Sequence, residues 1–174
     1  MFCYTAYMKD HCCIAFAGVV GSSKTPIANY LSTSLGLPVF NNDDIRKEVT
    51  EDMGHFDVEE YNSRQEQRCK AVLASGQSFI YDGSVDRKWP KFKGWLDQEN
   101  YRCFIISLNL SHKFLIELYE AKKYTEGHRL PELIEQHNDF VRQYGDAIGL
   151  HIDDTHFANR LNIAKEHVSH WLES

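Results

Sequence analysis

Gly18-Val19-Val20-Gly21-Ser22-Ser23-Lys24-Thr25 follows an apolar run, residues 14–17, and precedes a stretch of helical character that begins at Pro26. An apolar run that closes on glycine, then a loop ending in Lys-Thr, then a helix, is the setting of a phosphate-binding loop, or P-loop. A helix N-terminus offers unpaired N–H groups and the positive end of a dipole. Because that dipole is worth only about 0.3–2 kcal/mol, a lysine and a divalent cation must neutralise most of a nucleotide's charge. We therefore predict that this loop binds phosphate through Gly18, Gly21, Ser22, Ser23, Lys24 and Thr25.

Two residues of the loop have particular roles in this prediction. Lys24 is expected to reach the outer phosphates, and the Thr25 hydroxyl is expected to hold Mg²⁺. The match to the usual pattern, G-x-x-x-x-G-K-[ST], fails at one position, because Ser23 stands where glycine is usual. A β-carbon must then fit where the backbone approaches phosphate. The sequence thus predicts a P-loop with a local handicap at Ser23.

The composition is that of an ordinary globular protein. A length of 174 residues predicts a single domain, residues 1–174, in which residues 1–11 form a loosely held lead-in. The net charge of −6 argues against general nucleic-acid binding, although it allows a small phosphorylated ligand in a local basic pocket. Five cysteines without a C-x-x-C pair predict neither a disulfide framework nor a zinc site. Since we find no bilayer-length apolar stretch and no signal peptide, we expect a cytoplasmic protein without a membrane partner.

Apolar strands alternate with helical stretches along the chain. Strands are expected near residues 14–17, 37–40, 78–82, 103–108 and 148–152, and helices near 26–35, 58–75, 86–100, 111–124, 130–144 and beyond 157. This alternation predicts a parallel sheet covered by helices on both faces. Ligands bind such sheets at the carboxyl ends of the strands. The P-loop, the pair Asp43-Asp44, Asp82 and the pair Asp153-Asp154 all follow strands, so we expect them at that edge.

Three segments together resemble a known family: GVVGSSKT at 18–25, NNDDIRK at 41–47 and FIYDGS at 79–84. Their order and spacing, over roughly the first half of the chain, are similar to those of small P-loop kinases. The likeness is greatest to the zeta-toxin and polynucleotide 5′-hydroxyl kinase-like group. The resemblance implies a three-layer α/β P-loop NTPase fold, with a five-stranded parallel sheet, helices on both faces and a small helical lid. It also implies that the protein uses ATP and Mg²⁺.

The resemblance further implies roles for residues after the second strand. In such kinases the acid that opens the D-D-x-R element is the general base and the arginine binds substrate or phosphate, which makes Asp43 the candidate base and Arg46 the candidate clamp. A carboxylate within hydrogen-bond reach of an alcohol accelerates transfer by about 10²–10⁴-fold. The alternative is that Asp43 only caps a helix, while Asp44 is expected to cap or to face solvent. Asp82 ends a strand as a Walker-B carboxylate does. It either orients Mg²⁺ through water or contacts the substrate, or it forms an Asx-turn.

The second half of the chain departs from the family pattern, in which lid arginines close over the transferring phosphate. Here the lid candidates are Lys122, Lys123 and Arg129, and each lysine is equally well explained as a solvated helix end. Lysine lacks the bidentate fork of arginine, so such a lid would be weak. Arg87 is expected at the solvated start of a helix rather than in the cleft.

Three functions remain open from the sequence. The leading hypothesis is an ATP-dependent kinase that moves the γ-phosphoryl group to a hydroxyl of a small molecule or a nucleic-acid end, and the acidic net charge favours the small acceptor. A nucleoside or nucleotide kinase is the second, because Phe56, Tyr61 and Trp89 could stack on a base. The third is a degenerate P-loop protein that binds nucleotide without catalysis, which Ser23 and the arginine-poor lid suggest.

Overall fold

The computed structural model describes residues 10–125 and 127–174, so most of the expected lead-in, residues 1–9, lies outside the described residues. Its five strands form one parallel sheet in the order β2-β3-β1-β4-β5, which confirms the predicted sheet. The strands are β1 (Cys12–Ala17), β2 (Val39–Asn41), β3 (Phe79–Ser84), β4 (Arg102–Leu108) and β5 (Ile148–Ile152). The strand that leads into the P-loop is therefore the central one.

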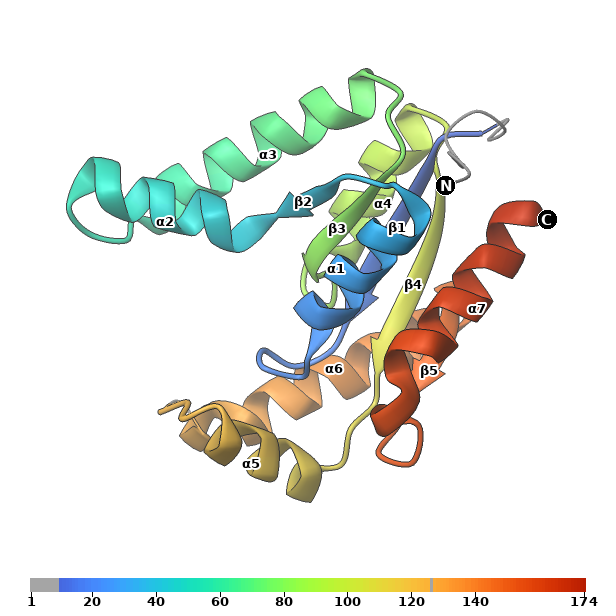
Figure 1. Cartoon of the computed structure of the whole chain (residues 1–174). Coiled ribbons are helices and arrows are strands. Elements are labelled where there is room, and N and C mark those ends of the chain that lie inside the picture. Colours follow the sequence, from blue (N-terminus) through green and yellow to red (C-terminus); the bar gives the residue numbers. More distant parts are fainter. Residues whose placement is uncertain (1–9, 126) are drawn as a thin grey trace.

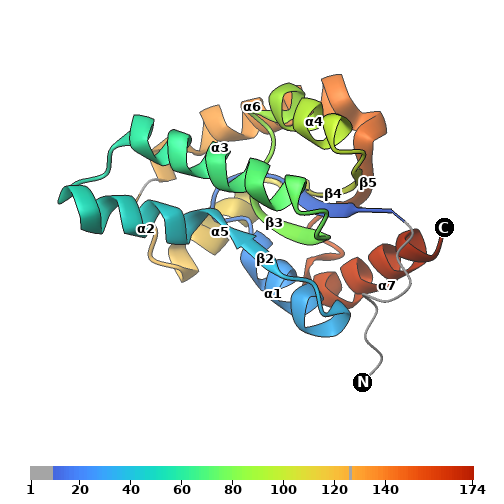
Figure 2. The same cartoon turned by 90° about the horizontal axis from the view of Figure 1, so that it is seen from above.

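Helices cover both faces of the sheet, as predicted. Seen along the sheet, α3, α4 and α6 lie on one side and α1 and α7 on the other (Figure 2). The α-helices are α1 (Lys24–Leu35), α2 (Asn42–Met53), α3 (Val58–Ala74), α4 (Trp89–Gln98), α5 (His112–Ala121), α6 (Leu130–Tyr144) and α7 (Arg160–Glu173). The α2–α3 hairpin extends away from the sheet as an arm (Figure 1). No helix in the described part of the chain is long and apolar enough to cross a membrane.

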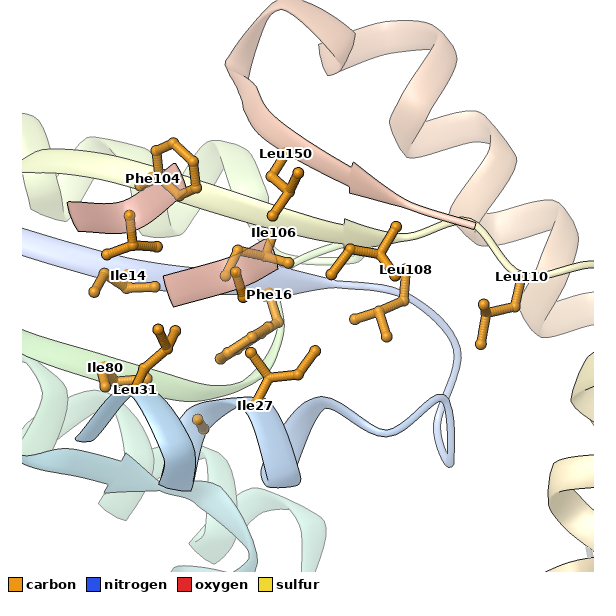
Figure 3. Close-up of a cluster of buried hydrophobic side chains, with 14 of the residues drawn as sticks. Ile14, Phe16, Ile27, Leu31, Ile80, Phe104, Ile106, Leu108, Leu110 and Leu150 are labelled. Atoms are coloured by element: carbon orange, nitrogen blue, oxygen red, sulfur yellow. The ribbon is translucent and has the colours of Figure 1, made fainter. Parts of the chain in front are cut away.

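The central strand fixes the position of the P-loop because it is buried on both faces. Every residue of β1 is buried, as a parallel strand between two neighbours requires. Ile14 and Phe16 pack with Ile27 and Leu31 of α1 (Figure 3). Ala15 and the other alternate residues of β1 pack into the second core, against α3, α4 and α6. The loop that follows β1 therefore starts from a rigid base.

Local signals set several helix ends where the sequence predicted them. α1 ends at Gly36, which adopts φ 70° and donates its N–H to Ser32 O at 2.9 Å. Ser111 caps α5, and its Oγ accepts from the Phe114 N–H at 3.2 Å. α5 ends at Ala121, before the predicted Tyr124. The cause is a left-handed residue, Lys123 with φ 56°, after which the chain turns back so that the Tyr124 N–H reaches Tyr119 O.

β3 is longer than the sequence predicted. It runs to Ser84, so Asp82 lies within the strand, paired in register with Asn41 of β2. The Asp82 carboxylate accepts a hydrogen bond from Thr25 at the start of α1. Asp82 therefore belongs to the sheet edge beside the P-loop rather than to an Asx-turn.

Candidate active site

A cleft of about 880 Å³ opens at the carboxyl edge of the sheet. Its lining combines the P-loop, the start of α2, the end of β3, the arm and the segment after α5. Of the predicted site residues it brings together Gly21, Ser23, Lys24, Thr25, Asp43, Arg46, Asp82 and Lys122. Residues from four separate stretches of sequence thus face one space.

The P-loop turns through three residues with positive φ: Gly18 at 136°, Gly21 at 80° and Ser23 at 81°. At Gly21 an added β-carbon would lie 2.8 Å from the Tyr119 ring, so glycine is required there. Ser23 is buried and left-handed, a conformation that costs a non-glycine residue roughly 1–2 kcal/mol. The handicap that the sequence predicted at Ser23 is therefore visible as backbone strain.

Lys24 lies across the mouth of the loop. Its Nζ donates to Gly18 O at 2.9 Å, to Val19 O at 2.7 Å and to Ser22 Oγ at 3.3 Å. Burial lowers the pKa of this ammonium to about 8. All three hydrogen-bonded oxygens are neutral, and the carboxylates of Asp86, Asp82 and Asp43 act on the ammonium only through their charge. A phosphate would add opposite charge in direct contact with it.

Thr25 and Asp82 form the pair predicted to hold Mg²⁺. Thr25 Oγ1 donates to Asp82 Oδ1 at 3.2 Å, and burial raises the pKa of this carboxylate. Magnesium commonly takes one or two protein oxygens and completes its shell with water and phosphate oxygens. The described residues contain no group of three or more His, Cys, Asp or Glu side chains that could hold a metal. A hydroxyl beside a buried carboxylate fits Mg²⁺ held jointly with a nucleotide.

Asp43 lies in the cleft and is not the cap of α2. Asn41 is the cap, because its Oδ1 accepts from the Asp43 N–H at 2.9 Å. Asp44 is exposed and approaches Lys47 at 3.7 Å, as expected for a solvent-facing residue. The capping alternative for Asp43 is therefore wrong, and its side chain is available to the cleft.

Arg46 is held by an aromatic stack. Its guanidinium carbon lies 3.9 Å from the centre of the Phe56 ring, and Phe56 in turn packs against Tyr61 with ring centres 5.6 Å apart. Phe56 and Tyr61 line the cleft, whereas Trp89 is buried in the core against Phe92. Two of the three candidate stacking aromatics are thus at the site, and one is not.

The lid segment contacts the P-loop directly. Lys122 Nζ donates to Gly21 O at 2.7 Å, and the Tyr119 hydroxyl donates to Val20 O at 2.7 Å. The other lid candidates, Lys123 and Arg129, are not among the lining residues of the cleft. Tyrosine contacts with the loop were not predicted, because Tyr119 follows the apolar spacing of a core helix.

A buried pair behind the P-loop was also missed. Both carboxylate oxygens of Asp86 accept from the Gly18 N–H at 3.1 Å, and His137 Nδ1 lies 3.0 Å from Asp86 Oδ2. Burial acts to raise the pKa of Asp86, but the hydrogen bond and charge of His137 outweigh it, so the pKa is lowered. His137 Nε2 lies 2.8 Å from Asn109 Oδ1 on the other side. No local signal reveals this network, because its members come from four distant segments.

The expectation that Arg87 lies outside the cleft is wrong. Arg87 is exposed, as predicted, but it lines the cleft in the turn before α4. The prediction failed because α4 begins only at Trp89, which leaves Arg87 in a turn that faces the arm.

The chain matches no protein-family model and no curated protein. Its structure does resemble solved structures. A gluconokinase from Sinorhizobium meliloti 1021 superposes with a TM-score of 0.69 at 16% identity, covering 93% of this chain and 94% of that one. A shikimate kinase from Acinetobacter baumannii gives a TM-score of 0.58 at 15% identity, over 98% and 97% of the two chains.

A third similar structure is of the PezAT chromosomal toxin–antitoxin system of Streptococcus pneumoniae, with a TM-score of 0.64 at 13% identity over 95% of this chain and 88% of that one. The chain has the P-loop kinase fold. The predicted fold class is thereby confirmed. At these identities the likeness concerns the fold alone, and a P-loop kinase fold by itself does not assign a substrate.

Proposed function

We propose that this protein is an ATP-dependent phosphotransferase that moves the γ-phosphoryl group to a hydroxyl of a small molecule. The observation that supports the proposal is one cleft into which Lys24, the Thr25–Asp82 pair and Asp43 all open. Phosphoryl transfer needs little covalent chemistry from the protein, so positioning and charge neutralisation account for most of the catalysis. These side chains provide both.

Lys24 and Thr25 bind the nucleotide and its metal ion in this proposal. Lys24 exchanges the carbonyls of Gly18 and Val19 for the outer phosphates, and Thr25 and Asp82 hold Mg²⁺. Held by Thr25 and Asp82, Mg²⁺ would supply positive charge that offsets the charge of the phosphates. Lys122, which already reaches the P-loop, adds positive charge from the lid.

Asp43 and Arg46 act on the acceptor in this proposal. Asp43 takes the proton of the acceptor hydroxyl, and Arg46 binds the acceptor or the transferring group. Both residues lie in the first turns of α2, on the arm side of the cleft. The likeness to the zeta-toxin and polynucleotide kinase-like group rests on this segment together with residues 18–25 and 79–84, and it remains part of the proposal.

The first test is equilibrium binding of Mg·ATP by calorimetry. We expect a Kd near 1 μM, equivalent to about −8 kcal/mol, and loss of binding in Lys24→Ala. Absence of binding in the unmodified protein would mean that the strained Ser23 disables the loop.

The second test concerns the general base. Asp43→Asn should lower kcat by about 10²–10⁴-fold and leave the Kd for Mg·ATP unchanged, because Asp43 contacts the acceptor only. Asp44→Asn is the matched control, since Asp44 is the neighbouring carboxylate and faces solvent. Unchanged turnover in Asp43→Asn would remove the base assignment.

Two other functions have specific support. Phe56 and Tyr61 in the cleft favour a nucleoside or nucleotide kinase, which comparison of acceptor panels would identify. The left-handed Ser23 and the arginine-poor lid favour a nucleotide-binding protein without catalysis. Tight nucleotide binding with neither transfer nor hydrolysis would support the latter. We also propose a cytoplasmic location, which is compatible with each of these functions. The described cysteines are all free thiols, as a reducing compartment would keep them.

A further inference from the structure

Positive charge gathers at the acceptor end of the cleft. Arg46 of α2, together with Arg87 and Lys88 of the turn before α4, lines this end, where Asp43 is the nearby carboxylate. The whole chain carries a net charge of −6, so this local excess runs against the average. The cleft's other cations, Lys24 and Lys122, bond to oxygens of the P-loop and belong to the nucleotide end.

In the described part of the chain, these three cations form no ion pair with an acidic residue. Within residues 10–125 and 127–174, no ion pair joins Arg46, Arg87 or Lys88 to a carboxylate. Arg64 of the neighbouring helix α3, by contrast, contacts three carboxylates. Like charges that line one cleft repel one another, so an anion that binds between them lowers the electrostatic free energy of the site.

Arg46 is arranged to receive that anion. The stack on Phe56 orients the guanidinium, whose carbon lies 3.9 Å from the ring centre, and does not require its N–H donors. A planar guanidinium fork matches a carboxylate or a phosphate in a bidentate manner. Burial raises the pKa of Tyr61, and the charges of Asp43, Arg46 and Arg87 all act on it. Residues from α2, α3 and the turn before α4 therefore converge around one point.

Asn42 supplies an independent sign of a ligand. Its side chain is 8% exposed, it lines the cleft, and its amide Oδ1 is buried without a hydrogen-bond partner. Its position is fixed by close packing, because a β-carbon on Gly83 would come within 2.0 Å of Asn42 Nδ2. A buried amide oxygen without a partner is matched by a donor on a ligand, such as a hydroxyl. Asn42 directly precedes Asp43, the candidate base.

We propose that the acceptor is a small hydroxyl compound that carries its own anionic group, a carboxylate or a phosphate. Arg46 and Arg87 bind the anion, Asn42 accepts a hydrogen bond from a hydroxyl, and Asp43 takes the proton of the reacting hydroxyl. The acceptor oxygen bonds to the γ-phosphorus, the bond from that phosphorus to the β–γ bridging oxygen breaks, and ADP leaves. This inference rests on the proposed function and narrows its substrate class.

The first experiment compares acceptors that differ only in the anionic group. Gluconate against sorbitol and glycerate against glycerol test the carboxylate, while glycerol 3-phosphate against glycerol and AMP against adenosine test the phosphate. Binding to the full chain without nucleotide is followed by amide NMR titration, and transfer is followed by mass spectrometry of products. We expect the anionic member alone to shift the amides of Arg46, Phe56 and Arg87. Equal binding of neutral members, binding of no anionic member, or acceptance of only a 5′-hydroxyl oligonucleotide would overturn the inference.

The second experiment removes the cations. Arg87→Gln and Arg46→Gln should each weaken binding of the anionic member roughly 10–100-fold, the usual effect of losing a charge-assisted hydrogen bond, and change binding of its neutral counterpart little. Lys47→Gln is the matched control, because Lys47 is the next residue of the same helix and its side chain is 73% exposed. If both variants bind anions as the unmodified protein does, Arg46 and Arg87 are not the anion site.

The experiments distinguish failure of the proposed kinase function from failure of the inferred acceptor class. Anion binding that depends on Arg87, in a protein that neither binds Mg·ATP nor transfers phosphate, would retain the inferred site and remove the proposed kinase function. Transfer to neutral hydroxyl compounds at rates equal to their anionic partners would retain the kinase and remove the inferred acceptor class.

Discussion

Ser23 holds a left-handed conformation, φ 81° and ψ 34°, at the last position of the P-loop before the helix. Its side chain makes no capping hydrogen bond that would offset this strain. The left-handed conformation costs a non-glycine residue roughly 1–2 kcal/mol of folding free energy. Glycine avoids this strain, but it loses more conformational entropy on folding, which offsets part of the difference. The loop therefore keeps its shape because α1 and β1 are packed around it.

Ser23→Gly should relieve this strain. We expect the free energy of unfolding to rise by up to about 1 kcal/mol and the Kd for Mg·ATP to fall, because the β-carbon no longer stands beside the phosphates. Asn100→Gly is the control, since Asn100 is also left-handed, with φ 55°, and lies outside the cleft. Urea unfolding and calorimetry measure both effects. Weaker Mg·ATP binding in Ser23→Gly would show that the serine hydroxyl helps to hold the nucleotide.

The lowered pKa of Lys24 should make the proposed nucleotide binding depend on pH. Burial brings this pKa to about 8, so in the free protein the ammonium is charged below pH 8 and neutral above it. Affinity for Mg·ATP should therefore fall as the pH rises from 7 to 9.5. Because phosphate raises the pKa in the complex, binding near pH 9 should take up a proton.

Calorimetry in buffers of different ionisation enthalpy counts that proton. Lys24→Arg is the control, because its guanidinium stays charged throughout this range; neither the proton uptake nor the decline in affinity around pH 8 should be seen in it. A Kd that stays constant from pH 7 to 9.5 would mean that Lys24 does not carry the binding charge.

At the scale of an element, the turn between β3 and α4 supports the first glycine of the P-loop. Both carboxylate oxygens of Asp86 accept a hydrogen bond from the Gly18 N–H, and His137 of α6 lies against the same carboxylate. One buried carboxylate therefore ties β1, α4 and α6 together at the start of the loop. Removing its charge leaves the Gly18 N–H and His137 with a poorer partner.

Asp86→Asn should lower the free energy of unfolding by about 1–3 kcal/mol and weaken Mg·ATP binding several-fold. Asp97→Asn is the control, because Asp97 pairs with Lys93 on the exposed side of α4. Chemical unfolding and calorimetry on both variants separate the two effects. Lower stability with unchanged Mg·ATP affinity would show that Asp86 supports the fold and not the loop.

At the scale of the whole molecule, the core and the arm carry different parts of the candidate site. The sheet and α1 present the P-loop, whereas α2 and α3 carry Asp43, Arg46 and Tyr61. The two arm helices are joined by Arg64 of α3, which contacts Glu48 and Asp52 of α2. The hydrogen bonds of Arg68 and Arg64 lower the pKa of Glu48 to about 2, so Glu48 is charged throughout the neutral range.

Arg64→Met should loosen the arm without affecting the P-loop. We expect the KM for the acceptor to rise several-fold while the Kd for Mg·ATP stays unchanged, because Arg64 contributes only to the arm. Arg142→Met is the matched control: Arg142 contacts two carboxylates within α6 and joins no second helix. An equal change in acceptor KM and in Mg·ATP affinity would mean that arm and core do not act separately.

The sequence by itself determined the fold class and the position of the candidate phosphate-binding loop. Strands and helices alternate with apolar patterns that a parallel sheet covered on both faces buries, and the Gly18–Thr25 motif places its proposed phosphate-binding groups within eight consecutive residues. The same local logic located Asp43 and Asp82, because parallel strands carry their following residues to a common edge.

Only the tertiary structure decided the contacts between distant segments. Asp86 and His137 lie 51 residues apart, Lys122 reaches Gly21 across 101, and Arg87 faces the arm because α4 begins later than its pattern suggests. Local pattern fixes which face of an element is apolar, but side-chain partners depend on how elements pack, which no short stretch encodes. The acceptor end of the cleft, built from three such segments, therefore emerged only from the folded chain.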